Sequence, residues 1–284
     1  MICDYQTNKV YLAEGIRHYE TVAHNLLWAL YTEGIETEYL RHTASPKHIW
    51  ARDYMPIQLD KDLFLQYRYA PDYLRNDPDY IPPYETICRG LRLRCKQTRL
   101  VIDGGNVVKF RNRVIMTDKV LVENPGYTEG YIRKQLEEAF GCEVVLIPWD
   151  RYEMFGHADG MVRAISDDYL LLNNYIDIDK SLRKRILSAL EWRFYVEELH
   201  YDRPRPSPLS WAYLNFLHVN SCIFVPGLGL KEDHAALEQI QKHYPHYKVV
   251  LVPGCQDLVK EGGALNCITW NILADRKDPS QQEA

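Results

Sequence analysis

The chain has 284 residues, of which 46% are hydrophobic and 26% are charged, and its formal net charge is −5 at pH 7. A chain of this length buries enough surface to hold a shaped pocket, whereas its acidic balance argues against a nucleic acid or an anionic membrane as partner. No apolar run approaches the roughly 20 residues of a membrane span, and residues 1–6 lack the features of a signal peptide, so we predict a cytoplasmic protein.

In chain order, short β-rich runs open five similar units at Lys9, Leu63, Val114, Tyr169 and Cys222, which are 51 to 55 residues apart. Amphipathic helical patterns follow four of these runs, at residues 16–31, 131–140, 181–192 and 231–243. Similar strands at 144–148 and 249–253 close the third and fifth units, and both end in proline. A near-constant period of this kind indicates a closed array such as a propeller, so we expect one domain over residues 1–275 and a polar tail over 276–284.

A short polar segment follows the last strand of each unit. The five segments are 50–53, 103–106, 156–160, 213–215 and 261–267. Their polar residues Asp53, Asp103, His157, Asn215 and Cys267 lie 50 to 58 positions apart. If the units surround one axis, equivalent loops converge there and these residues meet in one pocket.

Each of these residues also has an ordinary structural interpretation. Cys267 is one of seven cysteines, and a free cysteine is usually a small buried hydrophobe. His157 fits a core histidine, Asp53 fits a partner for an arginine, and 101–108 has the propensities of a hairpin turn. Their joint occurrence at one period favours function. The odd number of cysteines and the absence of a C-x-x-C pair argue against both a disulfide framework and structural zinc.

The residue types suit the chemistry of a guanidinium ion. Two carboxylates on different loops, Asp53 and Asp159, can hold this planar cation by charge-assisted hydrogen bonds and present its carbon to a Cys267 thiolate. An ordinary thiol is only slightly ionised at neutral pH, so the bound cation or His157 must stabilise the thiolate. The loops at Tyr67–Tyr84 and Asp202–Pro208 are candidate borders of the pocket.

These motifs, which extend from Trp50 to Trp270, resemble those of agmatine deiminases and bacterial, Porphyromonas-type peptidylarginine deiminases, a family of guanidino-group-modifying enzymes. The resemblance implies a five-bladed α/β propeller (the pentein fold) built from pseudo-symmetric ββαβ repeats. It also implies site roles for seven residues: nucleophile Cys267, general acid and base His157, supporting acid Asp103, guanidinium ligands Asp53 and Asp159, pocket wall Trp50, and pocket residue Asn215.

The resemblance further implies hydrolysis of a guanidino group to a ureido group and ammonia through a covalent thiouronium, without metal or organic cofactor. Asp103 replaces a glutamate common in relatives, and the residues flanking Cys267 depart from those of agmatine-specific enzymes. Agmatine, arginine and peptidyl-arginine therefore remain open as substrates, with Arg203 and Arg205 as carboxylate contacts, and homo-oligomer formation is also open. An amidinotransferase and a non-catalytic binding protein are the alternatives, and a thiol protease ranks lower.

Overall fold

The computed structural model describes residues 1–153, 155–201 and 207–275, and its strands form five three-stranded sheets. The strands, grouped by sheet, are β15 (Thr269–Ile272), β1 (Lys9–Ala13) and β2 (Glu36–Leu40); β3 (Ile57–Asp60), β4 (Leu63–Arg68) and β5 (Cys95–Val101); β6 (Val108–Lys109), β7 (Arg113–Thr117) and β8 (Glu143–Ile147); β9 (Val162–Ala164), β10 (Tyr169–Leu172) and β11 (Tyr195–Glu198); and β12 (Leu217–Val219), β13 (Cys222–Pro226) and β14 (Lys248–Val252).

All five sheets have the same internal plan. The middle strand pairs antiparallel with one neighbour and parallel with the other. The chain passes from the middle strand to its parallel neighbour through helical segments, as parallel pairing requires. The helices are α1 (Glu20–Thr32), α2 (Ala51–Tyr54), α3 (Tyr84–Gly90), α4 (Lys119–Glu123), α5 (Glu129–Phe140), α6 (Tyr175–Ile178), α7 (Lys180–Leu190), α8 (Glu232–His243) and α9 (Gln256–Lys260).

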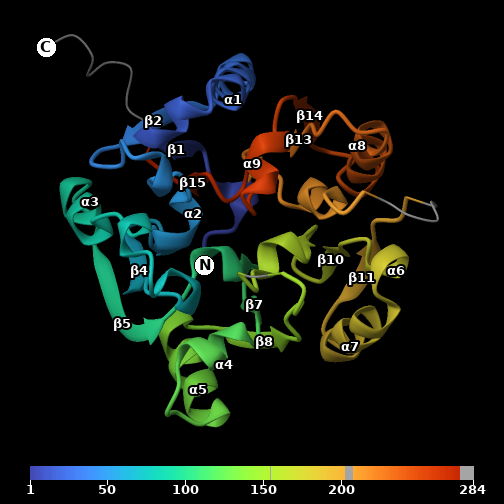
Figure 1. The fold of residues 1–284 in the computed structure, drawn as a ribbon. Helices are drawn as coiled ribbons and strands as arrows, with labels where there is room; N and C mark the ends of the chain where they lie inside the picture. Colours follow the sequence, from blue (N-terminus) through green and yellow to red (C-terminus); the bar gives the residue numbers. More distant parts are fainter. Residues whose placement is uncertain (154, 202–206, 276–284) are drawn as a thin grey trace, which may run out of the picture.

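The first sheet joins the two ends of the described chain. Strand β15 pairs with β1 from Lys9 opposite Ile272 to Leu12 opposite Thr269. In Figure 1 the five sheets surround a common centre, and α1, α3, α5, α7 and α8 lie toward the outside. The strand supplied by the end of the chain completes the first sheet, so all five units have three strands.

The local sequence explains these elements. Strand β1 is buried along its whole length, and α5 buries Ile132, Leu136 and Phe140 on one face, as an amphipathic helix does. Thr128 caps the first turn of α5 through its side chain, and Gly141 ends the helix in the left-handed conformation. The five predicted opening strands and the helices predicted at 131–140, 181–192 and 231–243 are present, with ends shifted by at most three residues.

Two local expectations differ from the structure. The predicted helix 16–31 is divided into a 3-10 helix, Glu14–His18, and α1, because Tyr19 has φ −106° and ψ 61°, outside helical values. The segment 101–108 is not a hairpin, because β5 and β6 belong to different sheets. It is the passage from one unit to the next. Among the described residues, no helix has the length and apolar character needed to cross a membrane.

Candidate active site

The predicted site residues all lie where the chain passes from the outer strand of one sheet to the first strand of the next. Asp53 is in α2, between β2 and β3, and Asp103 precedes a 3-10 turn, Gly104–Asn106, between β5 and β6. His157 and Asp159 lie between β8 and β9, Asn215 between β11 and β12, and Cys267 just before β15. All six side chains belong to residues that are at most 9% exposed.

His157 is in ion-pair contact with two carboxylates. Its Nε2 lies 2.8 Å from Asp103 Oδ2, although the two are not aligned for a hydrogen bond, and its Nδ1 lies 4.0 Å from Asp53 Oδ1. The short Asp103 side chain therefore reaches the histidine. The Tyr73 hydroxyl donates to the same Asp103 Oδ2 at 2.5 Å, so one oxygen joins the tyrosine and the imidazole.

Gly105 allows this close approach of Asp53 and His157. A Cβ at Gly105 would lie 2.5 Å from His157 Nδ1 and 2.7 Å from Asp53 Oδ1, closer than any real contact. A residue with a side chain at this position would push the two groups apart. This requirement explains the second glycine of the Asp103-Gly104-Gly105 segment.

Cys267 faces the other carboxylate and an amide. Its Sγ lies 3.3 Å from Asn215 Oδ1 and 3.7 Å from Asp159 Oδ2, within hydrogen-bond range for sulfur. Asp159 Oδ2 also accepts a 2.7 Å hydrogen bond from Asn266 Nδ2. The thiol thus belongs to a buried polar cluster whose residues come from three different connections between successive sheets.

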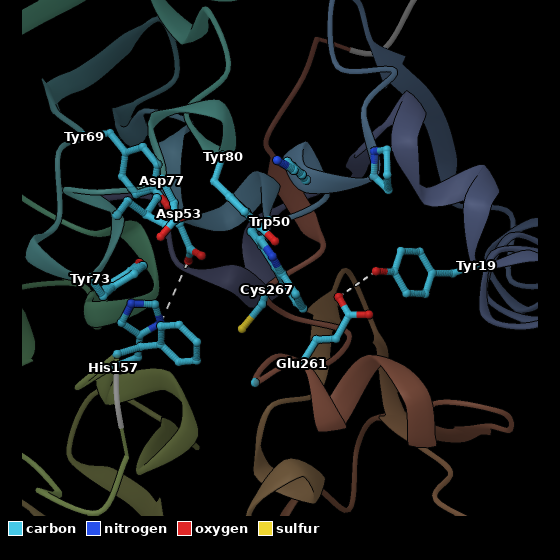
Figure 2. Close-up of a pocket in the computed structure, with 15 residues that line it drawn as sticks. Tyr19, Trp50, Asp53, Tyr69, Tyr73, Asp77, Tyr80, His157, Glu261 and Cys267 are labelled. Atoms are coloured by element: carbon cyan, nitrogen blue, oxygen red, sulfur yellow. Dashed lines mark hydrogen bonds and ion pairs between the residues drawn. The ribbon is translucent and has the colours of Figure 1, made fainter.

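Aromatic rings border the thiol. In Figure 2 Cys267 lies between Trp50 and His157, with Asp53 above it. The Trp50 ring packs on Gly263, whose added Cβ would lie 2.1 Å from the ring. Gly262 has φ +97° and faces the Phe155 ring in the same way. Both glycines of the predicted C-terminal segment are therefore needed for close packing of aromatic rings around the site.

Burial and the nearby charges shift the acidities of the site. Burial, followed by the negative charge of Asp159, raises the pKa of Cys267 to about 12, although the nearby His157 acts in the opposite direction. Burial and the Asp103 charge raise the pKa of Asp53 well above its ordinary value. Burial lowers the pKa of His157, but Asp103 and Asp53 outweigh it and raise that pKa well above 6.5. At neutral pH the site without ligand therefore combines an imidazolium with a neutral thiol.

Several buried polar atoms of the site have no hydrogen-bond partner among the described residues. They are Asp53 Oδ1, Asn215 Nδ2 and Asn266 Oδ1, whereas His157 Nε2 has its ion-pair contact with Asp103. Buried polar groups without partners are uncommon, and each is destabilising by about 1–3 kcal/mol unless something else satisfies it. Their concentration around Cys267 and His157 indicates a ligand with both donors and acceptors.

A cavity of about 610 Å³ opens onto Cys267, His157, Asp53 and Trp50, and the predicted border loop Tyr67–Tyr84 forms much of its wall. The loop contributes Tyr69, Tyr73, Leu74, Asp77 and Tyr80. Sequence reasoning identified this loop but not its individual residues, and it missed Phe155 and Asn266, although Asn266 directly precedes the cysteine. The other predicted contacts, Arg203 and Arg205, lie outside the described residues.

The same cluster has the ligand types of a metal site. Asp53, Asp103 and His157 each offer one ligand atom, and these atoms lie within 4.8 Å of one another. A metal would have to displace the proton that the two carboxylates hold on the imidazole, because only the neutral ring is a ligand.

Fold and site together define a class of α/β protein in which repeated sheet units bring a buried cysteine, a histidine and three aspartates to one place. Residues 2–272 match the Porphyromonas-type peptidyl-arginine deiminase family. The chain belongs to this family, which confirms the resemblance seen in its motifs.

Its relatives include the agmatine deiminases of Medicago truncatula, 26% identical over 210 residues, and of Pseudomonas aeruginosa, 26% identical over 227 residues. These matches cover 60% and 66% of this chain, and the chain spans only 56% and 61% of the two relatives. The structure of agmatine deiminase of Enterococcus faecalis superposes with a TM-score of 0.74 at 18% identity, covering 95% of this chain and 94% of that one. This last likeness shows that the two chains share an α/β fold.

Proposed function

We propose that the protein is a deiminase that hydrolyses a guanidino group to a ureido group and ammonia, with Cys267 as nucleophile. The observation that carries this proposal is the position of the Cys267 thiol in a buried site with carboxylates on both sides, Asp53 beside His157 and Asp159 beside the sulfur. Such a site is suited to a planar cation whose carbon the sulfur attacks.

Binding of the cation would also activate the thiol. Negative charge at Asp159 and Asp53 contributes to the raised pKa of Cys267. A guanidinium held by these carboxylates would compensate that charge, so the pKa of the thiol would fall on binding. The thiol would then release its proton to solvent, and the thiolate would form only with substrate in place. His157, kept protonated by Asp103 and Asp53, would remain ready to act as an acid.

The reaction then has two halves. The Cys267 thiolate attacks the guanidinium carbon, a C–N bond breaks, and His157 gives its proton to the departing nitrogen, which leaves as ammonia. A thiouronium that still carries the substrate's tail remains on the sulfur. His157 next takes a proton from water, and the resulting hydroxide adds to the carbon. The C–S bond then breaks while the proton of the new hydroxyl group passes to the sulfur, which releases the neutral ureido product and restores the Cys267 thiol.

The roles of the other residues belong to the same proposal. Asp103 supports His157, Trp50 forms a wall beside the guanidinium, and Asn215 lies against the thiol at 3.3 Å. The family and its agmatine deiminase members lead us to propose agmatine, arginine or an arginine-containing peptide as the substrate. No metal or organic cofactor takes part in these steps.

The decisive assay measures ammonia and the ureido product from agmatine, arginine and an arginine-containing peptide. Cys267→Ala should reduce the activity at least about a thousandfold, whereas Cys142→Ala, at a free and partly exposed cysteine outside the site, should leave it unchanged. A haloacetamidine should label Cys267 covalently. Ammonia release that survives Cys267→Ala, or labelling of another cysteine instead, would contradict the assignment.

The carboxylate clamp has its own test. Asp53→Asn and Asp159→Asn each remove one charge-assisted partner, for which we expect losses of about 1.5–3 kcal/mol, or roughly 10- to 100-fold in kcat/KM. Asp257→Asn is a matched control, because this aspartate is exposed and forms an ion pair with Lys260 at the surface. Unchanged kcat/KM in both site variants would refute the clamp.

We further propose that the five sheets form a five-bladed α/β propeller of ββαβ repeats, with residues 1–275 as one domain. The common plan of the sheets and the pairing of β15 with β1 support this arrangement. The cytoplasmic location and the oligomeric state stay predictions.

A further inference from the structure

Cys267 lies between two cavities, not at the end of one. Besides the first cavity of about 610 Å³, a second of about 510 Å³ opens onto the same sulfur. Among the described residues, only His157, Gly262 and Cys267 border both cavities. The two carboxylates of the clamp are divided between them, with Asp53 in the first and Asp159 in the second. A guanidinium in the clamp would therefore lie at the junction.

The first cavity is suited to the substrate's tail. Trp50, Tyr69, Tyr73, Tyr80 and Phe155 give it aromatic walls, against which methylene groups can pack. Its lining includes Asp53 and His157, which face each other across 4.0 Å. A guanidino group held at the junction, with its tail extending outward through the first cavity, would close this side of the sulfur to solvent.

Deimination makes a second opening useful. The leaving group is ammonia, the small end of the substrate, and the thiouronium keeps its tail until hydrolysis. The first cavity is therefore still occupied both when ammonia has to leave and when water has to enter. An amidinotransferase would not meet this difficulty, because there the tail itself departs before the acceptor arrives.

The second cavity has the charge and the polar groups for ammonium and water. No lysine or arginine is among the described residues that line it, and its carboxylates include Asp150, Asp159 and Asp179. Neutral groups satisfy these carboxylates: Tyr175 donates to Asp150, Asn266 to Asp159, and two backbone N–H groups at the start of α7 to Asp179. Apart from His157 at the junction, no described lining residue supplies a positive charge to compensate these carboxylates, so they favour a small cation.

One buried side chain offers a donor for water at the same place. Asn215 is 1% exposed and borders the second cavity, and its Nδ2 has no hydrogen-bond partner among the described residues. Its Oδ1 lies 3.3 Å from Cys267 Sγ, so a water oxygen bound to Nδ2 would be next to the reacting carbon.

We infer that the second cavity is a separate route to Cys267 through which water enters and ammonium leaves, while the substrate's tail occupies the first cavity. This inference rests on the proposed deiminase function. It assigns the second cavity to small polar species and predicts that narrowing it would slow hydrolysis of the covalent intermediate more than its formation.

The test narrows each cavity separately. Ile178→Trp and Ser207→Trp, singly and together, place indole rings in the second cavity, at an exposed and a partly buried residue respectively. Leu74→Trp and Asp77→Trp do the same in the first. With agmatine or the fastest compound of the panel, steady-state kinetics are combined with quenched-flow ammonia release and intact-mass measurement of the enzyme-bound adduct. Thermal melting confirms folding, and the single variants serve if the double one is unstable.

In the second-cavity variants we expect kcat to fall at least fivefold, kcat/KM to change less than twofold, and the covalent adduct to accumulate. The first-cavity variants should instead lower kcat/KM without accumulating adduct. A raised KM with no extra adduct in the second-cavity variants would place the tail there and overturn the inference, and so would wild-type kinetics. If the wild type forms neither ammonia nor adduct with any compound, the proposed function itself fails.

Discussion

The contact between Asp103 and His157 gives the sharpest prediction for the proposed reaction. Replacing Asp103 by Asn keeps the shape of the side chain but removes a charge 2.8 Å from His157 Nε2. Two unit charges at this distance attract each other by about 6 kcal/mol at an effective dielectric constant of about 20. Removing the Asp103 charge should therefore lower the pKa of His157, and Asp53, which stays 4.0 Å from the other ring nitrogen, should keep part of the increase.

The direction of the effect follows from the role of His157 as an acid. In the wild type its raised pKa keeps the ring protonated at neutral pH, and activity falls as the pH rises through that pKa. In Asp103→Asn this loss of activity should occur at lower pH, so kcat at pH 7 should drop by roughly 10²- to 10⁴-fold, the usual contribution of an acid or base. Lowering the pH should restore part of the activity.

The assay is the pH profile of kcat for ammonia release in the wild type, Asp103→Asn and Asp103→Glu. Asp103→Glu keeps the charge, so its profile should stay near that of the wild type even if the longer side chain lowers the maximum. Tyr73→Phe removes only the 2.5 Å hydrogen bond to the same oxygen and should have a smaller effect. The reasoning fails if Asp103→Asn keeps both the profile and the kcat of the wild type.

Three further outcomes test the same site. Gly105→Ala should lower kcat/KM at least about 100-fold, because its Cβ would collide with His157 and Asp53. Gly130→Ala, in open space on α5, is the control and should be neutral or slightly stabilising. Equal effects of the two variants on activity would contradict the packing argument. When agmatine binds to Cys267→Ala at mildly acidic pH, protons should be released, since the cation lowers the raised pKa of Asp53. The measurement is calorimetry in several buffers, and a binding heat that does not depend on the buffer would contradict this proton release. Dialysis against EDTA should leave activity unchanged, and recovery only on adding a metal would assign the cluster of Asp53, Asp103 and His157 to metal binding instead.

Much of the fold follows from local patterns in the sequence. The five opening strands and the helices around residues 131–140, 181–192 and 231–243 are where periodicity predicts them, because strand and helix periods of apolar residues are local properties. The period of about 50 residues also locates one candidate site residue in each connection between successive units. Glycine-rich segments mark Gly105 and Gly263, although sequence does not say what they approach.

Which residues face one another in the site depends on how the five sheets close around their common centre. The pairing of Lys9 with Ile272 joins parts of the chain that no local pattern connects, and it brings Cys267 into the same site as Asp53 and His157. The segment 101–108 has the propensities of a hairpin, yet its two strands pair with different partners, because tertiary packing outweighs turn propensity there.

Residue types and their spacing were enough to predict a cysteine, a histidine and three aspartates in one pocket. Only the tertiary structure shows that Asp103 reaches His157 despite its short side chain, that Tyr73 shares its oxygen, and that Cys267 lies between two cavities. These features depend on distances of a few ångströms between loops far apart in sequence, and such distances are determined by packing of the whole chain, not by any segment of it.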